Sequence, residues 1–167
     1  MSAQPLKVLV DTNVWLHYFE GGGLGAKESA ALIRTLIAQE AVLYSAALSL
    51  KDVYYLHQRN QKKKIHARGV CLDKGTVAAI RESAWSCVRS MRELSIVVPV
   101  GQSDILQATT YRDLHDDFED DLVLAAAQRV EATYLVTFDG RLCRRAPVAC
   151  LDPASLLTLL HAGQSVV

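Results

Sequence analysis

The sequence predicts an α/β protein with three layers (α/β/α), in which helices cover both faces of a four- to five-stranded, mainly parallel central sheet. Short apolar runs, such as residues 8–10, have the length and composition of fully buried strands. They alternate with longer segments whose apolar residues recur at helical spacing, and this alternation is typical of a covered parallel sheet. The chain of 167 residues shows no linker or internal repeat, so we expect a single domain over residues 1–167.

The first half of the chain is expected to alternate strands and helices. In chain order we expect a strand at 8–10, helices at 12–19 and 26–38, and a strand at 42–44. The glycines at 21–23 separate the first two helices. Ser49 and Asp52 have the spacing of a capping box and predict that a further helix opens at Ser49. The polar, basic residues 59–69 are expected to form a helix end and a loop.

The second half continues the alternation. In chain order we expect a helix at 76–93, a strand at 96–99, helices at 103–114 and 119–130, and strands at 134–137 and 148–150. Ser103 is the expected N-cap of its helix, with Asp104 in the first turn. Pro153 follows Asp152 and marks the first turn of a last helix, a position that proline favours.

The composition indicates a globular protein. Half of the residues (50%) are hydrophobic and the formal net charge is zero, so a nucleic-acid partner would need a local basic patch. The four cysteines, Cys71, Cys87, Cys143 and Cys150, form no C-x-x-C pair, so we expect free thiols in a reducing cytosol. Neither a signal peptide nor a membrane span is evident, which predicts a cytoplasmic location.

Acidic residues lie where the carboxyl ends of the strands are expected. Asp11 directly follows the first strand, Asp139 follows Thr137, and Asp52 and the acids at 116–121 lie near helix starts. Each has a local explanation as a helix cap or turn residue. Ligand sites in such sheets lie beyond the carboxyl ends of the strands. Gathered carboxylates repel one another unless a cation lies among them, so together these acids predict an Mg²⁺ or Mn²⁺ site.

Three segments resemble motifs of the PIN-domain family, which includes bacterial VapC-type toxins. They are Val-Asp-Thr-Asn-Val at 10–14, Asp-Phe-Glu-Asp-Asp-Leu-Val-Leu-Ala-Ala-Ala at 117–127, and Tyr-Leu-Val-Thr-Phe-Asp at 134–139. They occur in the family's order and span most of the chain. The resemblance implies a metal-dependent endoribonuclease that leaves a 3′-hydroxyl and a 5′-phosphate.

The resemblance also implies roles for individual residues. The expected catalytic acids are Asp11, Asp52, Asp120 and Asp139, and the expected metal ligands are Asp11, Asp117, Asp120 and Asp139. Asn13 and Thr137 would orient a ligand or water. Asp52 stands where the family usually has the longer Glu, which puts the tightness of the site in doubt. Glu119 and Asp121 should point away from the metal and serve the helix dipole and solubility.

The RNA-binding surface is expected on basic side chains. The candidates are Arg59, Lys62, Lys63, Lys64, Arg68 and Arg141. Residues 59–68 contain five cations and no acid, although a solvated helix end is an equally good explanation. Arg144 and Arg145 could also meet phosphate.

The aromatic and histidine residues have mostly structural interpretations. Tyr54 and Tyr55 could stack on bases but are expected in the core, as is Trp85. Trp15 is also expected in the core, and His57 and His66 on the surface.

Two further functions remain open. A phosphatase with an aspartyl nucleophile would need a second Asp two residues after Asp11, where this chain has Asn13. A degenerate PIN fold could instead bind RNA or protein without cleaving, and the unusual Asp52 keeps that alternative open. For a toxin, the resemblance implies an antitoxin partner that blocks the acid site, an RNA substrate, and homodimer formation.

Overall fold

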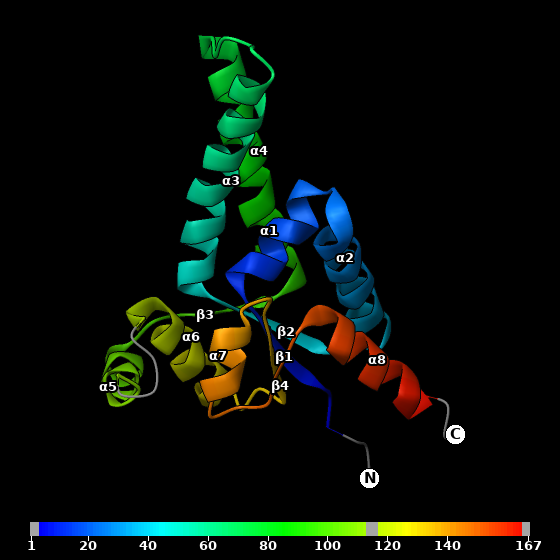
Figure 1. The fold of residues 1–167 in the computed structure, drawn as a ribbon. Coiled ribbons are helices and arrows are strands. Elements are labelled where there is room, and N and C mark those ends of the chain that lie inside the picture. Colours follow the sequence, from blue (N-terminus) through cyan, green and yellow to red (C-terminus); the bar gives the residue numbers. More distant parts are fainter. Residues whose placement is uncertain (1–3, 113–116, 165–167) are drawn as a thin grey trace.

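The computed structural model describes residues 4–112 and 117–164, which fold around a five-stranded parallel sheet (Figure 1). The strands are β1 (Lys7–Val10), β2 (Val42–Ala46), β3 (Ile96–Val98), β4 (Tyr134–Val136) and β5 (Cys150–Leu151). Their order across the sheet is β3-β2-β1-β4-β5, and β1 pairs with both β2 and β4. The carboxyl ends of β1 and β4 therefore lie side by side at the centre of one edge.

Eight helices are present in the described residues. They are α1 (Thr12–Glu20), α2 (Gly23–Ala38), α3 (Ala47–Ala67), α4 (Lys74–Leu94), α5 (Gln102–Thr110), α6 (Phe118–Arg129), α7 (Gly140–Arg145) and α8 (Pro153–Gln164). On one face of the sheet, Trp15 of α1 and Leu156 of α8 pack in one buried cluster with Val10. On the other face, Leu124 of α6 packs in a second cluster with Leu9. The prediction of a three-layer α/β/α fold is confirmed.

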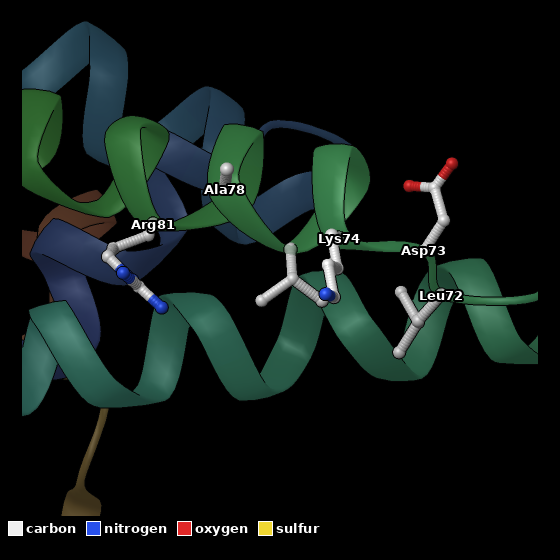
Figure 2. Close-up of a pocket in the computed structure, with 6 residues that line it drawn as sticks. Leu72, Asp73, Lys74, Ala78 and Arg81 are labelled. Atoms are coloured by element: carbon white, nitrogen blue, oxygen red, sulfur yellow. The ribbon is translucent and has the colours of Figure 1, made fainter.

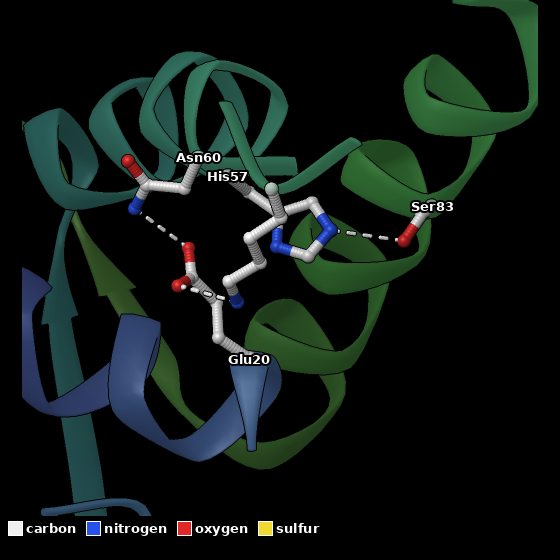
Figure 3. Close-up of polar contacts among 5 residues, drawn as sticks. Glu20, His57, Asn60 and Ser83 are labelled. Carbon is white, nitrogen blue, oxygen red and sulfur yellow. Dashed lines mark hydrogen bonds and ion pairs between the residues drawn. The ribbon is translucent and has the colours of Figure 1, made fainter. Parts of the chain in front are cut away.

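The antiparallel helices α3 and α4 extend together away from the sheet (Figure 1). His57 of α3 is buried between them, and its Nε2 lies 2.9 Å from Ser83 Oγ of α4 (Figure 3). Burial lowers the pKa of His57, and the nearby Glu20 carboxylate opposes that shift. The prediction that His57 lies on the surface is wrong, because the helix pair covers it. Trp85 is also misplaced by the sequence-based prediction, since it is 48% exposed on α4.

A polar contact at the end of α1 ties that helix to α3. Asn60 Nδ2 donates to Glu20 Oε1 at 2.8 Å, and Lys64 Nζ lies 3.3 Å from Glu20 Oε2 (Figure 3). The Lys64 ammonium is therefore already paired within the protein.

Helix α3 differs most from its prediction. It begins at Ala47 with Ala46 as its N-cap, so Ser49 lies inside the helix, buried, and no capping box forms. It also continues to Ala67 through the basic residues expected to be partly loop. Lys, Arg and Gln are good helix formers, and α4 supplies the packing partner that stabilises the extra turns.

Boundaries of other elements differ as well. The N-cap of α5 is Gly101, not Ser103, and Asp104 Oδ2 accepts the Gly101 N–H at 2.7 Å. That helix ends at Thr110, and the expected end near Leu114 lies outside the described residues. Strand β5 starts at Cys150, two residues later than expected. Helix α7 is absent from the predicted elements, and Asp139, for which the sequence allows a cap or a turn, is its N-cap.

The cysteine prediction is only partly correct. Cys87 is a buried free thiol and Cys71 an exposed one, but Cys143 and Cys150 form a disulfide. This bond joins α7 to β5, which the sequence spacing did not reveal. Within the described residues, no helix has the length and apolar character needed to cross a membrane.

Candidate functional site

Asp11 lies at the carboxyl end of β1, at the centre of the sheet. Its backbone N–H donates to Val136 O of β4 at 3.0 Å, which fixes the chain as it leaves the sheet. Its carboxylate then caps α1, because Oδ1 accepts the Thr12 N–H at 2.6 Å. Only 6% of the residue is exposed. A carboxylate is thus held almost out of water at the sheet edge.

Two neighbouring side chains hold the other oxygen of Asp11. Thr137 Oγ1 donates to Asp11 Oδ2 at 2.7 Å, and Asn13 Nδ2 donates to the same oxygen at 2.9 Å. Asn13 also contacts Thr137 Oγ1 at 2.8 Å, and its own carbonyl accepts the Phe138 N–H at 3.0 Å. The structure therefore brings Asn13 and Thr137 to Asp11, and this small network sets the carboxylate's orientation.

Asp139 lies beside this network and caps α7. Its N–H donates to Thr137 Oγ1 at 3.0 Å, while its Oδ1 accepts the N–H groups of Arg141 at 2.7 Å and Leu142 at 3.3 Å. Burial raises the pKa of Asp11, and the Asp139 charge adds to that effect. The hydrogen bond from Thr137 opposes it. The Asp139 carboxylate thus disfavours ionisation of Asp11, and a bound cation would remove that effect.

A second pair of carboxyl groups joins α3 to α6. Asp52 Oδ1 lies 2.9 Å from Lys51 Nζ, and Asp52 Oδ2 is buried with no hydrogen-bond donor among the described residues. The Glu119 carboxyl group lies beside Asp52, and this interaction together with partial burial raises the pKa of Glu119 to about 7. The negative charges of Asp52 and Asp117 act in the same direction, and the Lys51 ammonium opposes them. The prediction that Glu119 points away from the site is wrong.

The remaining acids of the third motif occupy the start of α6. Asp117 is its N-cap and accepts the N–H groups of Glu119 at 3.0 Å and Asp120 at 3.4 Å. Asp120 is half-buried in the first turn. Asp121 is buried, so the expectation that it promotes solubility is wrong. The capping bonds explain Asp117 locally, and its role as a ligand stays a prediction.

The acids match a hard divalent cation in their chemistry. Carboxylate oxygens suit Mg²⁺ and Mn²⁺, and the donor-less Oδ2 of Asp52 and the Asp11–Asp139 repulsion would both be relieved by one. Within residues 4–112 and 117–164, however, no three His, Cys, Asp or Glu side chains are gathered closely enough to coordinate one ion. Side-chain rotations would therefore have to complete the ligand set.

The basic residues are spread over a wide area. Arg59, Lys63 and Arg68 are exposed on or just after α3, and Lys62 is half-buried. At the helical rise of 1.5 Å per residue, this segment lies about 10–24 Å along the axis from Asp52. Arg141, in contrast, is exposed in the first turn of α7 beside Asp139.

Two functional candidates were missed by sequence reasoning, Lys51 and Glu119. Lys51 precedes Asp52 and pairs with it, which sequence adjacency could have suggested. Glu119 meets Asp52 only through tertiary packing, and no local pattern indicates that contact.

The sequence and the fold both match known proteins. The model of the PIN domain family matches residues 7–141. No curated protein sequence matches significantly. Among solved structures, a toxin–antitoxin complex from Klebsiella pneumoniae gives a TM-score of 0.59 at 18% identity, covering 87% of this chain and 97% of that one.

Two further toxin structures share the fold. VapC20 from Mycobacterium tuberculosis, a sarcin–ricin loop cleaving toxin, gives a TM-score of 0.60 at 17% identity, covering 85% of this chain and 97% of that one. VapBC2 from Rickettsia felis, bound to a DNA fragment from its promoter, gives a TM-score of 0.62 at 12% identity, covering 87% of this chain and 97% of that one.

Proposed function

This chain belongs to the PIN-domain family, and from that premise we propose that it is an Mg²⁺- or Mn²⁺-dependent endoribonuclease. It hydrolyses RNA phosphodiester bonds at an acidic site that contains Asp11, Asp52, Asp120 and Asp139. The observation that carries the proposal is the buried Asp11 carboxylate, oriented by Asn13 and Thr137 beside Asp139. The similar fold of VapC20, a toxin that cleaves the sarcin–ricin loop, supports RNA as the substrate.

The acidic side chains of such a site would bind the metal ion. Asp11, Asp120 and Asp139 would hold the cation, with Asp117 as the next candidate. When bound, Mg²⁺ or Mn²⁺ supplies activation of the attacking water and neutralisation of developing negative charge.

Positioning of the site comes from its neighbours. Asn13 and Thr137 hold Asp11 in one orientation, so its free energy of reorganisation during the reaction is small. Arg141, exposed beside Asp139, can pair with a phosphate of the substrate. Lys51 neutralises part of the Asp52 charge.

Cleavage of a structured RNA in Mn²⁺ tests the proposal. We expect Asp120→Asn to abolish most of the activity and excess chelator to abolish it in the wild-type protein. Asp73→Asn is the matched control, because Asp73 caps α4 far from the acids and Asn caps equally well. Undiminished cleavage by Asp120→Asn, or in excess chelator, would refute the assignment.

The alternative of a catalytically weak PIN-fold binding module is favoured by one observation, the Lys51–Asp52 ion pair at an acid position. Calorimetric titration with Mn²⁺ distinguishes the two. The nuclease requires saturable binding that is lost in Asp11→Asn and Asp120→Asn, whereas a binding module would show none. Another α/β phosphate hydrolase would be indicated by a trapped phospho-aspartate at Asp11.

The partners follow from the same relatives. Structures similar to this chain include toxin–antitoxin complexes, so an antitoxin that covers the acid site is the expected protein partner. We also expect a homodimer, which light scattering of the purified chain would detect. We also propose that residues 1–167 form a single PIN-like domain, which is supported by the packing of both hydrophobic clusters on one sheet.

A further inference from the structure

Three aromatic rings lie together on the outer surface of the α3–α4 pair. Tyr54 is 5.1 Å from Tyr55 and 5.0 Å from Trp85, measured between ring centroids. Tyr55 is 64% exposed and Trp85 is 48% exposed, although both were expected in the core. We call these three residues the aromatic platform. Large aromatic rings left in water at one place indicate a binding surface.

Basic side chains flank the aromatic platform on both helices. On α3, Lys51, Tyr55, Arg59 and Lys63 follow one another four residues apart, and all four are exposed. Residues at this spacing lie on one side of a helix, about 6 Å apart along its axis. The row starts at Lys51, which pairs with Asp52 of the candidate active site. It therefore leads from the acids directly to the aromatic platform.

Helix α4 extends this surface. Arg81 lies one helical turn before Trp85 and lines a groove of about 340 Å³ with Leu72, Lys74 and Val77 (Figure 2). Figure 2 shows the Lys74 and Arg81 side chains on the side of α4 that faces α3. Asp73, the acid at this groove, is engaged in capping α4. Cations thus lie on both sides of the aromatic rings.

We propose that the aromatic platform, with its flanking Arg59 and Arg81, binds unpaired RNA bases by stacking, next to the acids that cleave the strand. This inference rests on the proposed ribonuclease function and adds the substrate class, a strand whose bases near the cut are unpaired. Proteins that bind single strands combine a basic track with aromatic side chains on which bases stack. Positive charge beside exposed rings favours RNA over a neutral protein surface as the occupant.

Equilibrium binding of a short oligouridylate to the full chain in excess chelator tests the proposal without cleavage. Tyr55→Ala and Trp85→Ala should each weaken binding by roughly 5- to 100-fold. Trp85→Phe should restore most of the affinity, because phenylalanine still stacks. Leu24→Ala is the matched control, since Leu24 is an exposed apolar residue (71%) on α2. Circular dichroism verifies that each variant is folded.

An abasic strand with the same sugar–phosphate backbone separates stacking from charge. The aromatic variants should bind it as the wild-type protein does. The proposal is overturned if the alanine variants bind oligouridylate normally, or lose equal affinity for the abasic strand. Normal RNA binding with loss of a protein partner would also overturn it, and would assign the platform to protein docking. Stacking without Mn²⁺-dependent cleavage by the wild-type protein would refute only the proposed nuclease.

Discussion

Replacing Thr137 by valine removes one buried hydroxyl group and nearly preserves the side-chain volume. That hydroxyl donates to Asp11 Oδ2 at 2.7 Å and accepts the Asp139 N–H at 3.0 Å and Asn13 Nδ2 at 2.8 Å. A hydrogen bond to a charged group contributes about 1.5–3 kcal/mol to stability. The Asp139 N–H and Asn13 Nδ2 would also lose their acceptor, which costs additional free energy. We therefore expect Thr137→Val to lower the free energy of unfolding by about 2–4 kcal/mol.

Urea denaturation at neutral pH with excess chelator measures this loss. Thr133→Val is the matched control, because Thr133 lies exposed at the opposite end of the same strand and does not touch Asp11; its effect should stay within about 0.5 kcal/mol. A double-mutant cycle with Asp11→Asn should show a coupling of more than about 1 kcal/mol. A loss below about 1 kcal/mol in Thr137→Val, or no coupling, would show that the network does not hold Asp11.

Three further predictions concern other parts of the molecule. Reducing the Cys143–Cys150 disulfide removes the constraint on a short loop and should lower the free energy of unfolding by about 2 kcal/mol. Denaturation with and without a reducing agent measures this loss, and equal midpoints would contradict the prediction. Burial lowers the pKa of His57, so the unfolded chain takes up a proton more readily than the folded protein. The free energy of unfolding should therefore fall as the pH drops below 6.5, the ordinary pKa of histidine. His57→Gln should reduce this pH dependence, and an unchanged dependence in the variant would contradict the prediction. Lys63→Ala should reduce the salt dependence of RNA binding more than Lys64→Ala does, because Lys64 is paired with Glu20. The RNA affinity of each variant is measured over a range of salt concentrations, and an equal salt dependence in both variants would contradict the prediction.

Much of the fold was predictable because its signals are local. Apolar runs such as residues 8–10 can only be buried strands in this context, and their alternation with helices limits the sheet to a parallel one. The basic end of α3 was missed because polarity alone does not distinguish a loop from a helix that packs on one side. The basic segment is helical because it packs against α4, and this tertiary contact cannot be read from the local sequence.

In the candidate site, too, the local features were predictable and the tertiary contacts were not. Asp11 and Asp139 were placed by strand ends. Asn13 and Thr137 contact Asp11, and their roles toward a metal ion or water stay predictions. The contact between Asp52 and Glu119 could not be found, since it joins helices far apart in sequence. The exposure of Trp85 escaped prediction because helical spacing does not reveal which face a neighbour covers.

Three acids at the site also cap helices, so evolution can change the charge of the site without disturbing its scaffold. Asp11, Asp117 and Asp139 each stabilise the start of a helix through one carboxylate oxygen, and asparagine performs that task about as well. A single codon change from Asp to Asn can thus remove negative charge from the site while the helix starts remain intact. Descendants of this chain could lose the proposed cleavage and still keep the scaffold, which leaves their surfaces free to be selected for binding alone.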